Sequence, residues 1–176
     1  MQVILGLGSN LGDRILFLSQ AIKKLGKFLT NIQASSIYES KALLSKDASP
    51  EYDIDYLNLV IYADCSLEPQ QLLEHIKQIE QSVGRKERKD IWAPREIDID
   101  ILFYGNKKIS SENLVIPHTQ ILNRNFVVIP IAEILPNYIC TIEGKYFGKT
   151  MLEVASDLFA YPKLPNNLKL TNLCLE

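Results

Sequence analysis

The sequence predicts a mixed α/β fold with a mostly antiparallel sheet. Three observations predict it: apolar residues recur at helical spacing in two segments, short apolar runs with strand character lie between those segments, and turn-forming residues separate them. In chain order the elements are strand, helix, strand, strand, helix and strand. The 176 residues, 47% of them apolar, are enough for one domain with a sizeable core.

The first two elements follow directly from the start of the chain. Residues 3–8 form a short apolar strand, and a helix is expected after them. The apolar residues at helical spacing in this helix are Ile15, Leu18, Ile22 and Leu25. Asn10 is expected to cap its N-terminus, and Asp13 lies favourably in its first turn.

The middle of the chain predicts two strands, a helix and a further strand. Residues 30–39 and 55–64 form the strands, with a polar loop between them. Pro69 suits the first turn of the second helix, and Gly84 ends that helix. Its apolar stripe consists of Leu72, Ile76, Ile79 and Val83. The fourth strand starts at residue 97.

This order is the ferredoxin-like β-α-β-β-α-β arrangement, so we predict a ferredoxin-like α/β (α+β) sandwich with C-terminal additions. The additions are a short strand near Pro117, a helix over 125–134 and a last helix that begins at the capping box Thr150 to Glu153. Residues 161–176 are expected to form a tail or a linker.

Composition and charge exclude several classes of protein. A net charge of −2 gives no overall basic surface for nucleic acid, and no apolar run approaches the roughly 20 residues of a membrane span. The start does not resemble a signal peptide. Cys65, Cys140 and Cys174 lack metal-ligand spacing and are expected to be reduced thiols, mostly in the core. We therefore expect a cytoplasmic protein that binds neither nucleic acid nor membrane.

Gly6, Gly8 and Gly12 could belong to a phosphate-binding loop or to an ordinary turn. A dinucleotide-binding loop needs an acidic residue about 20 positions later, but residues 26–28 are not acidic, and the next strand runs into another strand. No Gly-Lys-Ser/Thr follows, as a P-loop would need. We interpret Gly8 to Gly12 as the turn from the strand into a capped helix and look for phosphate chemistry elsewhere.

The segment 85–95 is strongly cationic. Its cations are Arg85, Lys86, Arg88, Lys89 and Arg95, and its two anions leave a local charge of +3. A solvated surface loop is the ordinary interpretation of such a run. Trp92, the only tryptophan of the chain, argues against it, because a large ring there either packs on the core or clamps a flat ligand.

Asp98 and Asp100 follow this segment on the fourth strand. Side chains alternate along a strand, so both carboxylates point away from the face of Ile97, Ile99 and Ile101. Any half-buried strand shows such alternation. Two carboxylates this close nevertheless repel each other unless a cation lies between them, and they can share Mg²⁺. Two such ions about 4 Å apart would clamp the attacking and leaving oxygens of an in-line displacement.

Arg85 and Arg95 lie close to this pair in sequence. Cations there would neutralise the charge of a transferring phosphoryl group, and the loop could close over the site. The residues alone therefore predict Mg²⁺-assisted phosphoryl or nucleotidyl transfer from a nucleoside triphosphate. They do not say which phosphorus is attacked.

Five motifs occur in order along the chain: GSNLGDR, DYLN, IE…GR, WAPREIDIDIL and PH…NR.F. Together they resemble the 6-hydroxymethyl-7,8-dihydropterin pyrophosphokinase family of folate biosynthesis over roughly residues 1–155. The resemblance implies a single catalytic domain over 1–160. It also implies transfer of the β,γ-diphosphate of ATP to the pterin hydroxymethyl group with release of AMP, with two Mg²⁺.

The resemblance also implies roles for individual residues. The implied catalytic residues are Arg85, Arg95, Asp98 and Asp100, of which the two aspartates are also the metal ligands. The implied pterin-binding residues are Ser40, Leu43, Tyr56, Asn58, Trp92 and Phe126. The implied ATP-binding residues are Lys77, Glu80, Arg88, Trp92, Arg95, Ile101, His118, Thr119 and Arg124. Without the resemblance, Tyr56 and Phe126 would be interpreted as core aromatics.

Two other functions stay open at this point. A different two-metal nucleotidyl transferase or cyclase on a ferredoxin-like fold would leave the DYLN, W-x-P-R and PH…NR.F motifs unexplained. A ferredoxin-like binding module without catalysis would leave Asp98 and Asp100 without a function. The expected partners are ATP and 6-hydroxymethyl-7,8-dihydropterin, and relatives are sometimes fused to neighbouring folate enzymes, with which the segment after Pro162 is compatible.

Overall fold

The computed structural model describes residues 1–86, 90 and 92–175. In chain order, its first part consists of β1 (Gln2–Ser9), α1 (Arg14–Leu25), β2 (Leu29–Ala34), β3 (Tyr38–Ser40), β4 (Tyr56–Cys65), α2 (Pro69–Val83) and β5 (Asp98–Tyr104). The second part consists of β6 (Ile109–Ser110), β7 (Val115–Ile116), α3 (Asn125–Ile134), α4 (Met151–Phe159) and β8 (Leu168–Leu170). The predicted ferredoxin-like α/β sandwich is confirmed.

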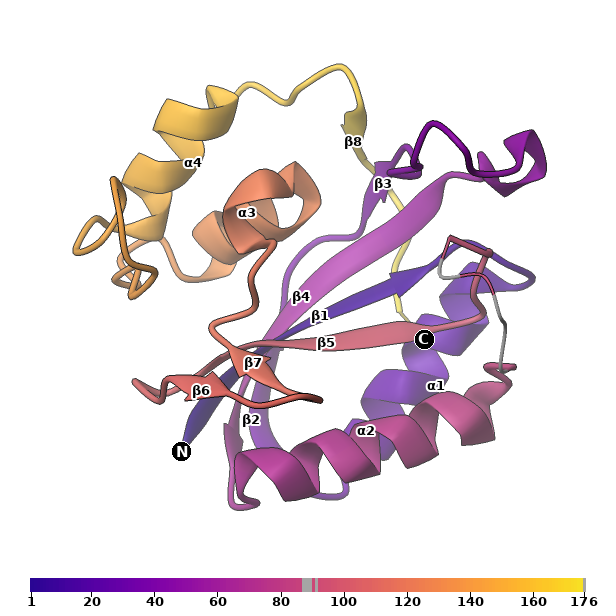
Figure 1. The fold of residues 1–176 in the computed structure, drawn as a ribbon, viewed down its shortest axis with the longest axis horizontal. Coiled ribbons are helices and arrows are strands. Elements are labelled where there is room, and N and C mark those ends of the chain that lie inside the picture. The colour runs from indigo at the N-terminus through magenta and orange to yellow at the C-terminus, as the bar shows by residue number, and fades with distance from the viewer. Residues whose placement is uncertain (87–89, 91, 176) are drawn as a thin grey trace.

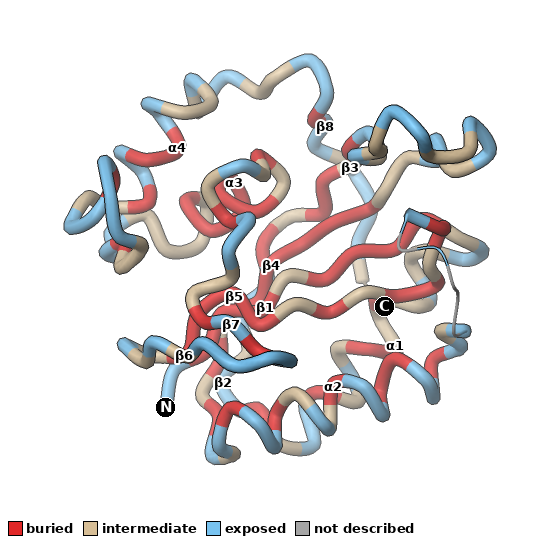
Figure 2. Tube along the Cα trace, viewed as in Figure 1, coloured by how far each residue is buried: buried red, intermediate tan, exposed pale blue. Residues whose placement is uncertain are grey.

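The main sheet has six antiparallel strands in the order β5-β1-β4-β3-β8, with β2 also paired to β4. α1 and α2 pack on one face of this sheet, and α3 and α4 pack on the other (Figure 1). β6 and β7 form a small separate ribbon. β1 and β4, in the middle of the sheet, are buried along most of their lengths (Figure 2).

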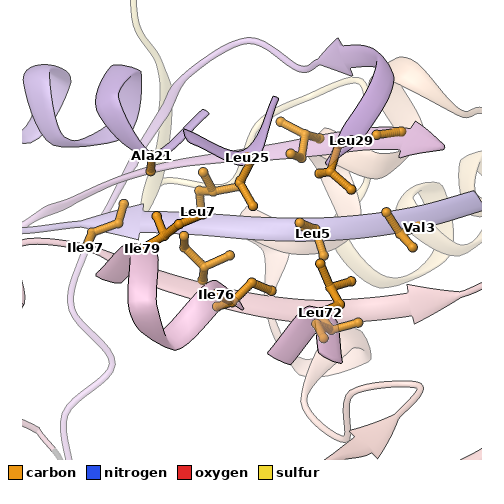
Figure 3. Packing of buried hydrophobic residues seen from close by; sticks show 14 of the residues in the cluster. Val3, Leu5, Leu7, Ala21, Leu25, Leu29, Leu72, Ile76, Ile79 and Ile97 are labelled. Atoms are coloured by element: carbon orange, nitrogen blue, oxygen red, sulfur yellow. The ribbon is translucent and has the colours of Figure 1, made fainter. Parts of the chain in front are cut away.

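The larger core lies between the sheet and the helices α1 and α2. Val3, Leu5 and Leu7 project from β1 toward this side because alternate strand residues share a face. Figure 3 shows them packed against side chains of both helices. The helical residues labelled there are Ala21 and Leu25 of α1 and Leu72, Ile76 and Ile79 of α2. The stripes predicted from helical spacing therefore form this core.

The N-terminus of α1 differs from the prediction. Asp13 is the N-cap, and its Oδ1 accepts a hydrogen bond from the backbone N–H of Leu16 at 3.1 Å. The assignment of Asn10 as the cap is wrong, because the Asn10 side chain is buried and tied to other segments. Gly12, with φ of 67°, makes the turn that separates the two residues.

The strand predicted over 30–39 is split into β2 and β3. Ser35 lies at the break, and its hydroxyl accepts a hydrogen bond from the N–H of Val60 at 3.0 Å. Ser36 is held in turn by Glu133 of α3, whose carboxylate accepts from the Ser36 hydroxyl at 2.6 Å. Side-chain bonds of this kind compete with regular strand pairing and explain the break.

The C-terminal part completes the second layer. α3 runs through Pro130, and α4 begins at the predicted capping box of Thr150 and Glu153. The segment 161–176, expected as a tail or linker, contributes β8, which pairs with β3. Leu168 is buried in this pairing and packs beside Tyr38.

Among the described helices, none combines the length and the apolar character needed to cross a bilayer. Cys65, Cys140 and Cys174 are free thiols, and the first two are buried as expected.

Candidate active site

A cleft of about 310 Å³ opens on the face of the sheet opposite α1 and α2, near one end of β1, β4 and β5. The predicted site residues that line it are Ser40, Leu43, Tyr56, Asn58, Trp92, Arg95, Asp98, Asp100, Arg124 and Phe126. They come from three strands, two loops and the start of α3. Residues far apart in the sequence therefore meet at one cavity of the size that holds a small ligand.

Asp98 and Asp100 face the cleft from β5, as strand alternation predicts. Ile97, Ile99 and Ile101 are buried in the core on the opposite face. Because β5 is the edge strand next to β1, the pair lies at the rim of the sheet. The backbone of β1 supports this position, since Gly8 pairs with Asp98 and Gly6 with Asp100.

Two arginines hold Asp98. Nη1 of Arg85 donates to Oδ1 at 2.6 Å, and Nη1 of Arg95 donates to Oδ2 at 2.9 Å. All three side chains are about a quarter exposed. The backbone of Arg95 is itself anchored, because its N–H donates to Oδ1 of Asn10 at 2.7 Å and its carbonyl accepts from the N–H of Asn10 at 3.1 Å. Asn10 thus positions Arg95, a role that the sequence alone did not indicate.

Asp100 has a looser set of partners. Nη1 of Arg124 lies 3.3 Å from Oδ2, and Nε2 of His118 lies 3.9 Å from the same oxygen. Burial and the negative charge of Asp98 raise the pKa of Asp100 above its ordinary value. The backbone N–H of Gln120 donates to Nδ1 of His118 at 3.2 Å, so a neutral His118 carries its hydrogen on Nε2 and directs it at Asp100. Burial and Arg124 keep His118 neutral by lowering its pKa.

Glu80 of α2 connects the helix layer to this rim. Its side chain is only 1% exposed. Oε1 accepts from Arg85 and from the backbone N–H of Ile99, the latter at 2.8 Å, and Oε2 accepts from Lys77 at 2.9 Å. Burial lowers the pKa of Arg85, but the carboxylates of Asp98 and Glu80 raise it, and the balance is a pKa above the ordinary value. Arg85 is therefore a fixed positive charge held between two carboxylates.

The other predicted ATP-side residues lie outside the cleft lining. The side chain of Ile101 lies in the core. The backbone N–H of Ile99 points away from β1, at the unpaired edge of β5, where it donates to Glu80. Along a strand, residues two apart point their backbone N–H and C=O groups to the same side. The backbone of Ile101 therefore faces the same edge. Thr119 is exposed. Arg88 lies outside the described residues.

Two aromatic rings frame the other part of the cleft. Tyr56 at the start of β4 and Phe126 at the start of α3 both line it. The buried amide of Asn58 lies between β3 and β1, and its Nδ2 donates to Oγ of Ser40 at 2.9 Å. Burial and Asp98 raise the pKa of Tyr56, so this ring is neutral. A flat ligand with polar edges suits this combination of rings and amide.

Gly8 forms part of the cleft floor, a role that the sequence did not indicate, because Gly8 was interpreted only as the start of a turn. A Cβ atom at Gly8 would lie 3.1 Å from Oδ1 of Asn58 and 3.4 Å from the ring of Tyr56. The missing side chain thus leaves room for both groups. The sequence did hold a signal for this open floor: Gly6 and Gly8 are two residues apart and therefore lie on the same face of the strand. Trp92 and Leu43 border the opening and are 38% and 50% exposed.

The residues at the rim fit a hard divalent cation whose remaining coordination positions are filled by a bound ligand and by water. Within the described part of the chain, no group of three or more His, Cys, Asp or Glu side chains could hold a metal. Mg²⁺ does not need one, because it is commonly bound by one or two carboxylates, with phosphate oxygens and waters as its other ligands. Asp98 and Asp100 meet that description, and the cations around them suit a polyphosphate.

The fold and the cleft define the class: a ferredoxin-like sandwich with a paired carboxylate, three arginines and two aromatic rings around one ligand site. A sequence profile of the 7,8-dihydro-6-hydroxymethylpterin-pyrophosphokinase (HPPK) family matches residues 4–136. The chain belongs to this family. It is accordingly an ATP-dependent pyrophosphokinase of folate biosynthesis, as the motifs implied.

Relatives agree with this assignment. A 2-amino-4-hydroxy-6-hydroxymethyldihydropteridine pyrophosphokinase from Aquifex aeolicus is 48% identical over 143 residues, which cover 81% of this chain and 86% of that protein. The Bacillus subtilis protein of the same name is 39% identical over 132 residues, 74% of this chain and 75% of that protein.

Longer proteins contain a similar region. A folate synthesis bifunctional protein of Chlamydia muridarum is 39% identical over 158 residues, which cover 88% of this chain but only 35% of that protein. A crystal structure of Plasmodium falciparum HPPK-DHPS with pterin and p-hydrobenzoate matches 96% of this chain and 47% of its own, with a TM-score of 0.70 and 17% identity. This structural likeness concerns the fold.

Proposed function

We propose that the enzyme transfers the β,γ-diphosphate of ATP to the hydroxymethyl group of 6-hydroxymethyl-7,8-dihydropterin. The products are AMP and the pterin diphosphate, and two Mg²⁺ are held at Asp98 and Asp100. The observation that carries this proposal is the common cleft of the acidic pair, Arg95 and Arg124 with the ring pair Tyr56 and Phe126. A site for a polyphosphate and a site for a flat heterocycle are thus adjacent.

The pterin side of the cleft would bind and orient the acceptor. Tyr56 and Phe126 stack on the ring system, and the amide of Asn58 reads its polar edge. Ser40 fixes that amide through the 2.9 Å hydrogen bond from Nδ2. Trp92 and Leu43 at the opening would cover the bound ring and exclude water. The hydroxymethyl group then projects toward the rim with Asp98 and Asp100.

In the chemical step, the hydroxymethyl oxygen forms a bond to the β-phosphorus. The bond between that phosphorus and the oxygen bridging to the α-phosphate breaks, AMP leaves with the bridging oxygen, and the hydroxyl proton passes to solvent. Magnesium, when bound, neutralises phosphate charge and orients the reacting oxygens. Arg85, Arg95 and Arg124 supply further positive charge, and Nε2–H of His118 can donate to a phosphate oxygen.

The identity of the nucleotide product tests this proposal. The protein is incubated with Mg-ATP and the dihydropterin alcohol, and the nucleotides are separated. AMP without ADP is expected. ADP would mean ordinary kinase chemistry, and pyrophosphate with a nucleotidylated acceptor would mean nucleotidyl transfer, the alternative that the acidic strand pair leaves open. Either of these outcomes contradicts diphosphate transfer.

We further infer a cytoplasmic enzyme in which residues 1–160 carry the catalytic domain. The bifunctional Chlamydia relatives support the idea that chains of this family work beside other folate enzymes. In this chain, β8 ties residues 168–170 to the main sheet next to Ser40. A fused partner would therefore follow a segment that lies close to the pterin side of the cleft.

A further inference from the structure

The carboxylate at the centre of the rim is engaged by the protein's own cations. Oδ1 of Asp98 accepts from Arg85 at 2.6 Å and Oδ2 accepts from Arg95 at 2.9 Å. Each oxygen therefore has a guanidinium partner at the length of a charge-assisted hydrogen bond. Each oxygen has a second lone pair that a metal ion could use, but the positive charge of a guanidinium at this distance neutralises the carboxylate and repels a divalent cation.

The neighbouring carboxylate is engaged far less. Asp100 has one arginine at 3.3 Å, and its contact to His118 at 3.9 Å is too long for a hydrogen bond. The two aspartates are thus unequal, although they are two residues apart on one strand face. Asp98 carries the tight ion pairs, and Asp100 is held more loosely.

From this difference we propose that Arg85 and Arg95 compete with the metal for Asp98. They neutralise this carboxylate in the nucleotide-free enzyme and transfer to the triphosphate when it binds, so the metal reaches Asp98 together with the nucleotide. This inference rests on the proposed function. Phosphate oxygens offer guanidinium groups a strong alternative partner, which makes the exchange favourable only when a polyphosphate is present.

Glu80 lowers the cost of that exchange for Arg85. The same guanidinium nitrogen that bonds Asp98 also bonds Oε1 of Glu80. Glu80 is buried and held by Lys77 and by the N–H of Ile99, so it keeps its place. When Arg85 leaves Asp98, its charge still has a carboxylate partner, whereas an isolated cation in this partly buried position would be strongly destabilised.

The test measures Mn²⁺ binding to the nucleotide-free protein by electron paramagnetic resonance. Arg95→Ala removes one competing cation and is expected to tighten Mn²⁺ binding about tenfold, the order expected from the loss of one unit charge beside a partly exposed carboxylate. Lys108→Ala removes a cation from the exposed pair with Glu143 and is the control, with unchanged Mn²⁺ binding. Affinities of the wild type and the Arg95→Ala variant within twofold of each other would overturn the inference.

A second variant and a second condition keep the two proposals separate. Arg85→Gln retains a polar partner for Glu80 and is also expected to tighten Mn²⁺ binding, with circular dichroism as the check on folding. A non-hydrolysable ATP analogue is then added to the wild type and to Asp98→Asn. If both bind Mn²⁺ equally well, the metal site of the proposed function is wrong. If Asp98→Asn loses Mn²⁺ but neither arginine variant gains affinity, only the competition fails.

Discussion

The two faces of the main sheet use alternate residues of the same strands for different purposes. Toward α1 and α2, β1 presents Val3, Leu5 and Leu7, all buried in a continuous apolar core. On the other face, near the cleft, the same strand presents Gly6 and Gly8. β4 and β5 follow the same division at the cleft, with aliphatic side chains toward α1 and α2 and Asn58, Asp98 and Asp100 toward the cleft. Away from the cleft the second face is apolar too, since Ile4, Val60 and Leu102 pack under α3 and α4. Near the cleft, therefore, core and polar side chains are one residue apart along each strand.

The largest effect on activity is expected from a substitution in the acidic pair on the cleft face. Asp98→Ala is expected to lower turnover about a thousandfold, which corresponds to about 4 kcal/mol in the barrier. The free energy of unfolding should change by no more than about 1 kcal/mol, because the loss of the pairs with Arg85 and Arg95 is partly offset by relief of the repulsion between Asp98 and Asp100.

Steady-state kinetics and urea unfolding measure the two effects. Asp157→Ala, which removes a surface carboxylate paired with Lys145, is the control for charge. An Asp98→Ala enzyme with a near-normal rate in Mg²⁺ would mean that the polar face does not carry the chemistry.

The opposite effect is expected from the apolar face. Ile76→Ala on α2 deletes a fully buried side chain of the larger core and should cost about 3 kcal/mol of unfolding free energy. Turnover at a temperature where the variant is folded should stay within about twofold of the wild type, since Ile76 does not line the cleft. Leu152→Ala on α4 is the matched control, because that side chain is 42% exposed and its loss should hardly change stability.

Arg95 tests whether the loop cations act on the transition state or on ground-state binding. Arg95→Ala should lower the single-turnover rate about a hundredfold and weaken ATP binding much less, because its charge acts on the transferring group. Arg95→Lys keeps the charge but loses the planar fork, so an intermediate rate is expected. Single-turnover rates equal to the wild type would show that Arg95 has no part in the chemical step.

The cleft floor should respond to a single added methyl group. Gly8→Ala places a carbon 3.1 Å from Oδ1 of Asn58, which must shift, and pterin binding is expected to weaken about tenfold (about 1.4 kcal/mol). Gly26→Ala at the end of α1 is the control, since its φ of −61° and its nearest contact at 3.5 Å accommodate a methyl group. Fluorescence titration with the pterin measures its affinity for both variants. Equal affinities of Gly8→Ala and Gly26→Ala would show that Gly8 is not part of the pterin site.

A smaller effect is expected where α3 is attached to the sheet. The hydroxyl of Tyr38 donates to Oε2 of Glu133 at 2.9 Å, and burial and this carboxylate raise the pKa of Tyr38. A phenol whose folded pKa is raised contributes stability that is complete below its unfolded pKa of about 10 and is lost as the pH rises above it. Tyr38→Phe should therefore cost about 1 kcal/mol at pH 7 and flatten the loss of stability above pH 10.

Urea unfolding at pH 7 and pH 10.5 measures both parts of this prediction. Tyr52→Phe, in the loop before β4, is the control. An unchanged alkaline slope in Tyr38→Phe would assign the pH dependence to other tyrosines.

The face covered by α1 and α2 was predictable from the sequence because its residues follow simple periods. Apolar spacing located both helices, and alternation placed Asp98 and Asp100 on one face opposite the isoleucines. These features depend only on residues close together in the chain.

Features that depend on contacts distant in sequence were missed. The break between β2 and β3 comes from Ser35 bonding to Val60, and β8 is a three-residue strand stabilised by its pairing with β3. Asn10 looked like a helix cap but is used to hold Arg95. Glu80 was implied as an ATP-binding residue, but its bonds to Arg85 and to the N–H of Ile99 exist only in the folded protein and were not foreseen.

A crystal structure with magnesium and a non-hydrolysable ATP analogue would show where the metal and the nucleotide bind. We expect metal ions bound to the carboxylate oxygens of Asp98 and Asp100, with the triphosphate beside them and the guanidinium groups of Arg85 and Arg95 on phosphate oxygens. Nucleotide bound elsewhere, with both arginines still on Asp98, would contradict this expectation.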